Sequence, residues 1–249
     1  MNKKVLAILL LIISISTIYA LYRLDRRCGY ITDEKWKIKS DTVIIIDDDG
    51  DPKGMRRMIK LCNELNIKCL FAVIGDRKEY YDFYDSCRAE GFRIVSHSYS
   101  HSKKLDPYED AYDTNVLRRD ILTAKKSLSK ITTDDSIFVA PRNCGKDYSS
   151  REILGEEHKI CFVGSFLPTD YFIYPRTHCI PRYFLGKNTP MPDFIKHIKI
   201  CRKYKKPIVL ALHSYNDNEW DYDYMKDCIK FALTSKVSAD GATALILSR

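Results

Sequence analysis

The sequence predicts an α/β fold, a parallel sheet with helices packed outside it. Apolar runs of strand length alternate with amphipathic helical patterns from residue 42 onward. Four of the predicted strands are followed directly by polar, chemically reactive segments. The chain has 249 residues, 45% of them apolar, which is enough for one substantial core. We therefore expect a single domain over residues 41–249.

The first 22 residues are expected to target the chain to a membrane. Two lysines precede an uncharged apolar run from Val5 to Tyr22. This run is about as long as a minimal bilayer span and longer than most signal-peptide cores. It favours an uncleaved signal anchor over a signal peptide or a buried helix. Residues 23–40 are polar and predict a stalk, so the domain would be extracytoplasmic, membrane-anchored, or secreted if the segment is cleaved.

The expected elements follow in order along the chain. Six strands are predicted by apolar runs bounded by turn residues, and a seventh by the apolar run near the end of the sequence. These strand segments are 42–46, 68–74, 92–96, 136–140, 159–163, 207–212 and, at the end, 243–248. Helical spacing predicts helices over 52–67, 77–91, about 107–130 and 191–204. Residues 164–190, with four prolines and several aromatic residues, are expected to form long loops over a barrel mouth or cleft.

Charge and cysteine content exclude two classes of protein. The net charge is +8, and the basic residues are scattered along the chain. No basic stripe with interleaved aromatic residues indicates a nucleic-acid partner. The excess could still favour an anionic envelope surface. Nine cysteines include no CxxC pair, so no structural zinc site is predicted. Several lie in apolar runs and are expected to be small buried residues. The oligomeric state is left open.

The polar segments that follow the strands predict one shared site. DDDG follows the strand at 42–46, HSYSH follows 92–96, APRNCG begins at the end of 136–140, and His213 follows 207–212. In a strand-helix barrel the carboxyl ends of the strands meet at one mouth, where active sites are built. Four such segments in register therefore indicate a common site.

Two histidines in HSYSH are the first candidate metal ligands. His97 and His101 are four residues apart, so a helical turn would present both on one side. No glutamate lies between them, unlike the HExxH motif of metalloproteases. A carboxylate from DDDG would supply a third ligand and leave an open position for water, as in catalytic zinc sites. A polar loop or surface pair is the alternative that the two histidines alone leave open.

These motifs resemble the polysaccharide deacetylase family, also called NodB-like or carbohydrate esterase family 4. The matching features are DDDG, HSYSH followed four residues on by Leu105, a proline-containing loop, and LALH at 210–213. The resemblance covers about residues 42 to 213. It implies a distorted (β/α) barrel of the NodB type, usually with fewer than eight strands. It also implies hydrolysis of acetyl groups, typically from N-acetylated sugars.

The resemblance assigns roles to the aspartates when the motifs are aligned on Gly50. Asp48 would be the general base and Asp49 a metal ligand, with Zn²⁺ as the expected metal. Asp47 then occupies a position where the family has an aromatic residue. A slipped register, in which Asp47 is the base or a supporting group, is the alternative. In the family, proline usually follows the glycine directly, whereas here Asp51 intervenes.

The other motifs of this sequence match those of the family to different degrees. His97 and His101 would complete the metal site, and His213 would be the general acid. The family's third motif has an arginine that contacts the catalytic aspartate. Here the segment Pro141-Arg142 offers an arginine two residues beyond that position, and a surface arginine is an equal alternative. The fourth motif, normally aspartate followed by tryptophan, has its nearest candidate in Asp170-Tyr171.

The expected activity is therefore metal-dependent removal of acetyl groups from an N-acetylated polysaccharide or oligosaccharide. Two alternatives remain at this point. A membrane-tethered carbohydrate-binding protein without catalysis is favoured by the weak third and fourth motifs. An O-acetyl esterase would use the same metal-assisted attack by water, because the motifs do not distinguish an amide from an ester.

Overall fold

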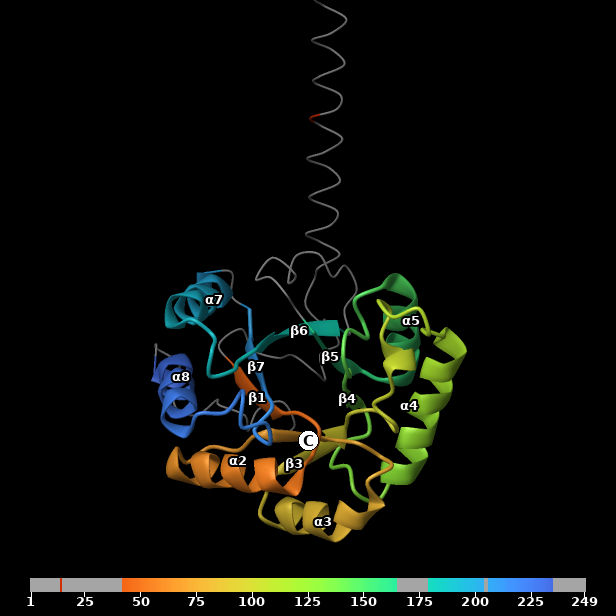
Figure 1. Cartoon of the computed structure of the whole chain (residues 1–249), viewed down its shortest axis with the longest axis horizontal. Helices are drawn as coiled ribbons and strands as arrows, with labels where there is room; N and C mark the ends of the chain where they lie inside the picture. The colour runs from red at the N-terminus through yellow and green to blue at the C-terminus, as the bar shows by residue number, and fades with distance from the viewer. Residues whose placement is uncertain (1–13, 15–41, 165–178, 204–205, 235–249) are drawn as a thin grey trace, which may run out of the picture.

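Seven parallel strands form a closed barrel with the helices outside it (Figure 1). The computed structural model describes residue 14 and residues 42–164, 179–203 and 206–234. This architecture confirms the predicted (β/α) barrel with fewer than eight strands. The predicted anchor and stalk, and the strand expected at 243–248, lie outside the described residues, apart from residue 14. No helix of the described part is long and apolar enough to cross a bilayer.

The strands follow the order of the chain around the barrel. Each strand pairs with the next, and β7 pairs with β1 along the whole of β1 to close the barrel. The strands are β1 (Val43–Asp47), β2 (Leu70–Val73), β3 (Arg93–Ser96), β4 (Ile137–Val139), β5 (Ile160–Gly164), β6 (Cys179–Phe184) and β7 (Ile208–Leu212). The α-helices are α2 (Pro52–Glu64), α3 (Tyr81–Ala89), α4 (Thr114–Leu128), α5 (Tyr148–Glu157), α7 (Met191–Lys203) and α8 (Tyr222–Thr234). Two short 3₁₀ turns are η2 (Lys78–Tyr80) and η3 (Lys103–Leu105).

Alternation along the strands divides the core into two layers. Ile44 and Ile46 of β1 belong to a cluster made of strand residues alone, which fills the barrel interior. Val43 and Ile45 point the other way and pack in the cluster that includes the inner faces of the helices. Strands buried on both faces explain the continuous apolar runs in the sequence. The same alternation directs Asp48, two residues beyond Ile46, toward the barrel mouth.

The cysteines of the described part are small buried residues, as expected. None of these eight forms a disulfide within the described residues, and all are buried in the core. They are Cys62, Cys69, Cys87, Cys144, Cys161, Cys179, Cys201 and Cys228. Burial raises the pKa of the thiols of Cys69, Cys144 and Cys161 well above the ordinary value, so these thiols remain protonated.

In two of the segments assigned from the sequence, the structure differs from the expectation. The helix expected from about residue 107 begins at Thr114, because the Asp113 side chain accepts a hydrogen bond from the backbone N–H of Asn115 and caps the helix there. In the stretch expected to be loops, residues 179–184 form β6. Pro181 lies inside this strand and removes one hydrogen-bond donor, which is why the segment did not resemble a strand.

Candidate active site

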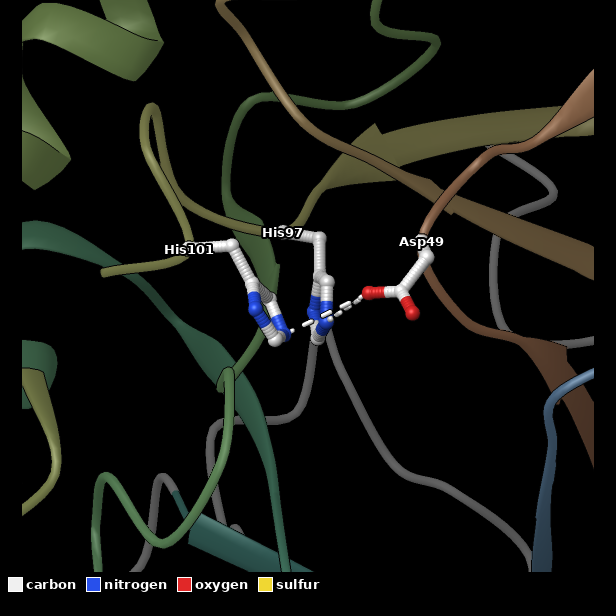
Figure 2. Close-up of side chains that lie close together, drawn as sticks. All are labelled: Asp49, His97 and His101. Atoms are coloured by element: carbon white, nitrogen blue, oxygen red, sulfur yellow. Dashed lines mark ion pairs between the residues drawn. The ribbon is translucent and has the colours of Figure 1, made fainter. Parts of the chain in front are cut away.

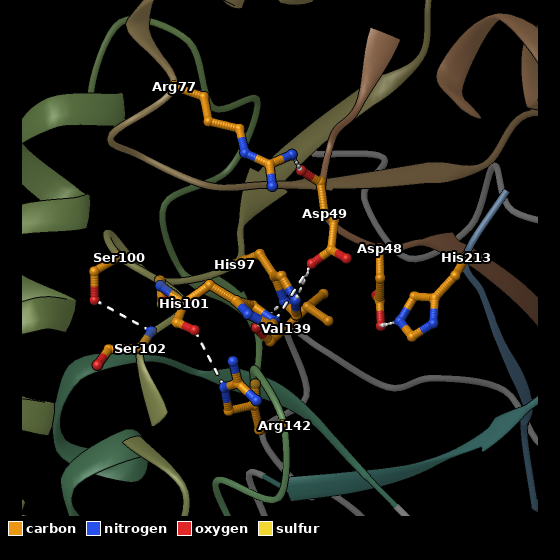
Figure 3. Close-up of polar contacts among 12 residues, drawn as sticks. Asp48, Asp49, Arg77, His97, Ser100, His101, Ser102, Val139, Arg142 and His213 are labelled. Carbon is orange, nitrogen blue, oxygen red and sulfur yellow. Dashed lines mark hydrogen bonds and ion pairs between the residues drawn. The ribbon is translucent and has the colours of Figure 1, made fainter. Parts of the chain in front are cut away.

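The predicted catalytic residues and metal ligands meet in one pocket at the carboxyl ends of the strands. Asp48 and Asp49 follow β1, His97 and His101 follow β3, and His213 follows β7. They line a common cavity of about 330 Å³. Figure 3 shows these side chains pointing toward one another from separate strands. The expectation that the polar segments after the strands form a shared site is therefore met.

Asp49, His97 and His101 form a cluster with the composition of a metal site (Figure 2). Asp49 Oδ1 lies 3.4 Å from His97 Nε2 and 3.3 Å from His101 Nε2. The three ligand atoms all lie within 4.8 Å of one another. Asp49 Oδ1 is buried and is not satisfied by a hydrogen bond within the described part of the chain. Two imidazoles and a carboxylate around such an oxygen fit a divalent metal, and Zn²⁺ prefers these donors.

The two imidazoles are presented by a tight loop and not by a helical turn. Ser98 and His101 both have left-handed backbone conformations, with φ of 75° and 51°. The Ser98 hydroxyl accepts a hydrogen bond from the backbone N–H of His101 at 3.0 Å. Asp120 of α4 accepts hydrogen bonds from the N–H groups of Tyr99 at 2.7 Å and Ser100 at 3.1 Å. The loop is therefore held from two sides, which offsets the backbone strain.

The protonation of the three groups suits metal binding. His97 Nδ1 lies 2.8 Å from the carbonyl oxygen of Val139, so Nδ1 carries the proton and Nε2 faces Asp49. Burial, with the neighbouring His97, lowers the pKa of His101 to about 4. Burial opposes ionisation of Asp49, but the contact with His97 and the two imidazoles outweigh it and hold its pKa below the ordinary value. The cluster thus offers a neutral imidazole at His101 and an ionised carboxylate at Asp49.

Asp48 is held by a buried arginine that the sequence did not single out. Arg182 Nη1 donates to both carboxylate oxygens of Asp48, at 2.7 and 2.5 Å. Arg182 Nη2 donates to the carbonyl oxygen of Ala140 at 2.6 Å. Burial alone would raise the pKa of Asp48, but the Arg182 charge and the contacts with His213 and His97 together outweigh it and lower the pKa. Asp48 is therefore ionised at neutral pH.

His213 lies between two carboxylates. Its Nε2 is 3.7 Å from Asp48 Oδ2, and its Nδ1 is 2.8 Å from Glu219 Oε2. Burial would lower the pKa of His213, but Asp48, Asp49 and Glu219 outweigh it and raise the pKa to about 9. The imidazole is therefore protonated at neutral pH. No sequence pattern had singled out Glu219, which lies in the turn before α8.

Comparison with known proteins agrees with this geometry. Residues 36–156 match the family model for polysaccharide deacetylases. This part of the chain is similar to the polysaccharide deacetylase family. The resemblance inferred from the sequence motifs is confirmed. Among curated protein sequences, none matches the chain.

Solved structures extend the likeness in fold beyond the residues that match the polysaccharide deacetylase family model. A candidate polysaccharide deacetylase from Mycobacterium smegmatis is 12% identical, with a TM-score of 0.55 over 82% of this chain and 86% of that chain. A family 4 carbohydrate esterase from Streptomyces lividans, in complex with acetate, is 12% identical, with a TM-score of 0.52 over 79% and 89%. At these identities the likeness shows the fold alone.

Asp47, at the position where the polysaccharide deacetylase family has an aromatic residue, does not line the pocket. It is buried and accepts hydrogen bonds from the backbone N–H and the hydroxyl of Ser214, at 3.1 and 2.7 Å. Burial raises the pKa of Asp47 to about 7 despite these hydrogen bonds. The structure thus places Asp48 at the pocket and Asp47 beneath the loop after β7, which gives no support to the slipped register.

The family's third and fourth motifs are where this chain departs most. Arg142 does not contact Asp48: its Nε donates to the carbonyl oxygen of His101 at 3.2 Å. The arginine on Asp48 comes instead from β6, so the expected role of Arg142 is corrected to Arg182. Pro141 is buried and precedes Arg142 in the loop. Asp170 and Tyr171, the candidates for the fourth motif, lie outside the described residues.

Proposed function

We propose that this protein is a zinc-dependent hydrolase that removes acetyl groups from N-acetylated sugars of a cell-envelope or extracellular polysaccharide. One observation carries the proposal: the Asp49, His97 and His101 cluster shares a single pocket with an ionised Asp48 and a protonated His213. The match of residues 36–156 to the polysaccharide deacetylase family model supports this chemistry.

Asp48 is proposed as the general base. It is ionised, it lies beside the cluster, and the hydrogen bonds from Arg182 Nη1 to both of its carboxylate oxygens fix its orientation. In this position it would accept the proton from the water that attacks the acetyl carbonyl. A Zn²⁺ held by Asp49, His97 and His101 would polarise that carbonyl and make the water more acidic.

His213 is proposed as the general acid. Its Nε2 faces the pocket, and Glu219 on Nδ1 stabilises the protonated ring. The ring packs beside Phe184 and Tyr215, with centroids 4.8 and 5.8 Å away. An amine leaves an acetyl carbon only with a proton, whereas an alcohol depends less on one. An imidazole held in its charged form therefore favours an N-acetyl over an O-acetyl substrate.

We also propose that residues 1–22 anchor the chain in a membrane, with the barrel on the extracytoplasmic side. The uncharged run from Val5 to Tyr22 supports this location. An envelope polysaccharide would then be within reach of the pocket. Fractionation of cells that express the chain, followed by protease treatment of intact cells, tests the location. Recovery of the chain in the soluble cytosolic fraction would exclude it.

The activity is tested by acetate release from a chitin oligomer, peptidoglycan and an O-acetylated glycan, using the zinc-loaded full-length chain. We expect Asp48→Asn and His213→Ala to keep zinc and to lose roughly 10²–10⁴ in rate. His97→Ala is expected to lose both zinc and activity. Zinc content is measured by elemental analysis, and Asp110→Asn, at an exposed turn, is the matched control.

Three outcomes separate the alternatives. Full activity of Asp48→Asn would remove the assignment of the base. Acetate released from the O-acetylated glycan alone would identify an esterase. Zinc and glycan binding without acetate release from any substrate would identify a carbohydrate-binding protein on a deacetylase fold.

A further inference from the structure

Arg142 has a strained backbone beside the metal cluster. Its φ of 51° is in the left-handed region, which costs a residue other than glycine roughly 1–2 kcal/mol. Its Nε donates to the carbonyl oxygen of His101, which ties the side chain to a proposed metal ligand (Figure 3). Strained residues persist where the surrounding structure fixes them, and they cluster at ligand-binding sites. The fold therefore holds this guanidinium in place at the pocket.

The two terminal amino groups of Arg142 have no hydrogen-bond or carboxylate partner in the part of the chain that the structure describes. Within the described residues, the Arg142 side chain makes one hydrogen bond, and it uses Nε. The two acids that line the pocket are both engaged, Asp48 by Arg182 and Asp49 by the imidazoles. A guanidinium with both terminal groups available matches a carboxylate or phosphate, to which it donates two parallel hydrogen bonds.

The wall of the pocket that carries Arg142 is basic. Lys146, four residues further along the same loop, also lines the pocket. Figure 3 places Arg142 and His213 on opposite sides of Asp49 and His97. On the His213 side the pocket is lined by Phe184, which is 40% exposed, and by Tyr215. A sugar that presents its acetyl group to the cluster would thus lie between an aromatic wall and a cationic wall.

We propose that the substrate of this pocket is an anionic glycan, in which a carboxylate or phosphate lies close to the N-acetyl group and binds Arg142. Lys146 adds to the positive potential that attracts this group. The proposal rests on the proposed deacetylase function and names its substrate class. A neutral glycan would accept hydrogen bonds from Arg142, but it would not supply a negative charge to the Arg142 guanidinium.

The test compares matched oligosaccharides with the zinc-loaded full-length chain. One substrate is a neutral N-acetylglucosamine oligomer, and two of equal length carry a carboxylate or a phosphate monoester on the neighbouring sugar. We expect kcat/KM for one anionic form to exceed the neutral value by about 10- to 100-fold. In Arg142→Gln this ratio should fall to near one, and added salt should reduce it in the wild type.

Two further measurements test whether the ratio of kcat/KM between anionic and neutral substrates depends on Arg142 in particular. Arg119→Gln removes the same charge from the exposed face of α4 and should leave the ratio unchanged. Calorimetry with Asp48→Asn, which is expected to bind substrate without turnover, gives the Kd of the anionic oligosaccharide directly. Adding Arg142→Gln to this variant should weaken that Kd by a similar factor.

The possible results separate this inference from the proposed function. Equal kcat/KM for neutral and anionic substrates would overturn the inference while the deacetylase assignment stands. A preference that Arg142→Gln leaves intact would also overturn it. If no substrate releases acetate, the proposed function fails, and the calorimetric effect of Arg142→Gln still decides whether this wall binds an anion. The carboxylate and phosphate forms identify which anion is preferred.

Discussion

Arg182 connects the proposed base to the wall of the barrel. Its guanidinium contacts both oxygens of Asp48 and the carbonyl oxygen of Ala140 at the end of β4. Both charged side chains are buried, with 6% of Arg182 and 3% of Asp48 exposed. A buried pair of this kind fixes the carboxylate in one orientation and keeps it ionised. One residue of β6 thus controls both the geometry and the charge of Asp48.

Replacing Arg182 should change stability and the pH dependence of activity together. In Arg182→Ala the buried Asp48 loses its partner, which typically costs about 3–5 kcal/mol of folding free energy. Because Arg182 lowers the pKa of Asp48, its removal should raise that pKa. The low-pH limb of kcat/KM should therefore move to higher pH. Urea unfolding and a pH–rate profile measure the two effects.

Arg182→Lys refines this prediction. It keeps the charge but loses the fork that reaches two acceptors at once, so we expect an intermediate shift of the low-pH limb. Arg119→Ala on the surface of α4 is the control and should leave the pH–rate profile in place. An unchanged low-pH limb in Arg182→Ala would show that Arg182 does not set the pKa of the catalytic carboxylate.

Some site residues could be predicted from local sequence and others could not. Asp48, Asp49, His97, His101 and His213 lie in short motifs directly after apolar strands, so the chain order alone indicates them. Arg182 is 134 residues from Asp48 in the sequence. It lies in β6, which was not predicted as a strand because it contains Pro181. Its contact depends on the closure of the barrel, which no local pattern encodes.

At the scale of elements, the loop after β7 is held by two neighbouring elements. Asp47 at the end of β1 accepts two hydrogen bonds from Ser214. Arg57 of α2 donates to the Ser214 carbonyl oxygen at 2.9 Å. A Cβ at Gly54 of α2 would lie 2.5 Å from Ser214 Oγ and 2.6 Å from the backbone nitrogen of Tyr215. The close approach of α2 therefore fixes the loop that carries His213.

Gly54→Ala is predicted to destabilise the protein although alanine favours helices more than glycine does. The added methyl group would overlap the 213–215 loop, and overpacking of this kind typically costs about 1–3 kcal/mol. Displacement of the loop should also lower kcat, because His213 moves with it. Thermal unfolding and steady-state kinetics measure the two effects.

Gly186→Ala is the matched control for this prediction. Its added Cβ would lie 3.4 Å from the nearest atom, Phe184 Cε1, which is about ordinary contact. This variant should keep wild-type stability to within about 0.5 kcal/mol. Equal stability of Gly54→Ala and Gly186→Ala would contradict the close packing of α2 against the loop.

The elements that sequence patterns predicted differ from those they missed in a consistent way. β1 and β7 are uninterrupted branched apolar runs, and α2 has apolar residues at helical spacing behind Pro52. In contrast, α5 buries two apolar side chains, Ile153 and Leu154, and depends on the Asp147 cap, so its pattern is weak. α8 has helical spacing, but it was not among the helices predicted from the sequence. Boundaries and short elements depend on capping and tertiary packing more than on periodicity.

At the scale of the whole molecule, two buried histidines lie outside the candidate site. His158 stacks on Phe138 at 4.8 Å, and its Nδ1 lies 3.1 Å from the carbonyl oxygen of Asp135. His197 of α7 stacks on Tyr183 at 4.2 Å. Burial lowers the pKa of both imidazoles to about 4, so the folded state holds them neutral. Each therefore couples global stability to pH.

The sign of this coupling is a loss of stability on acidification. Above pH 6.5 the imidazoles are neutral in the folded and unfolded states, so their contribution is constant. Between pH 6.5 and about 4 these two histidines bind protons in the unfolded chain but not in the folded protein. This difference in proton binding destabilises the folded state. A pKa difference of this size corresponds to about 3 kcal/mol per histidine at the end of the window. Urea unfolding at pH 7, 5.5 and 4.5, with EDTA to remove metal, measures the loss.

The double variant His158→Gln and His197→Gln separates these two groups from the carboxylates that also titrate in acid. Glutamine does not bind a proton in this range, so the variant should lose less unfolding free energy between pH 7 and 4.5 than the wild type does. With a reference pKa of about 6.5, a histidine of the unfolded chain is half protonated near pH 6.5. This is above the pH range where ordinary carboxylates titrate. The two stability curves should therefore diverge already at pH 5.5. Parallel curves over the whole range would show that these imidazoles have the same pKa in the folded and unfolded states and that their burial does not control the acid stability of the barrel.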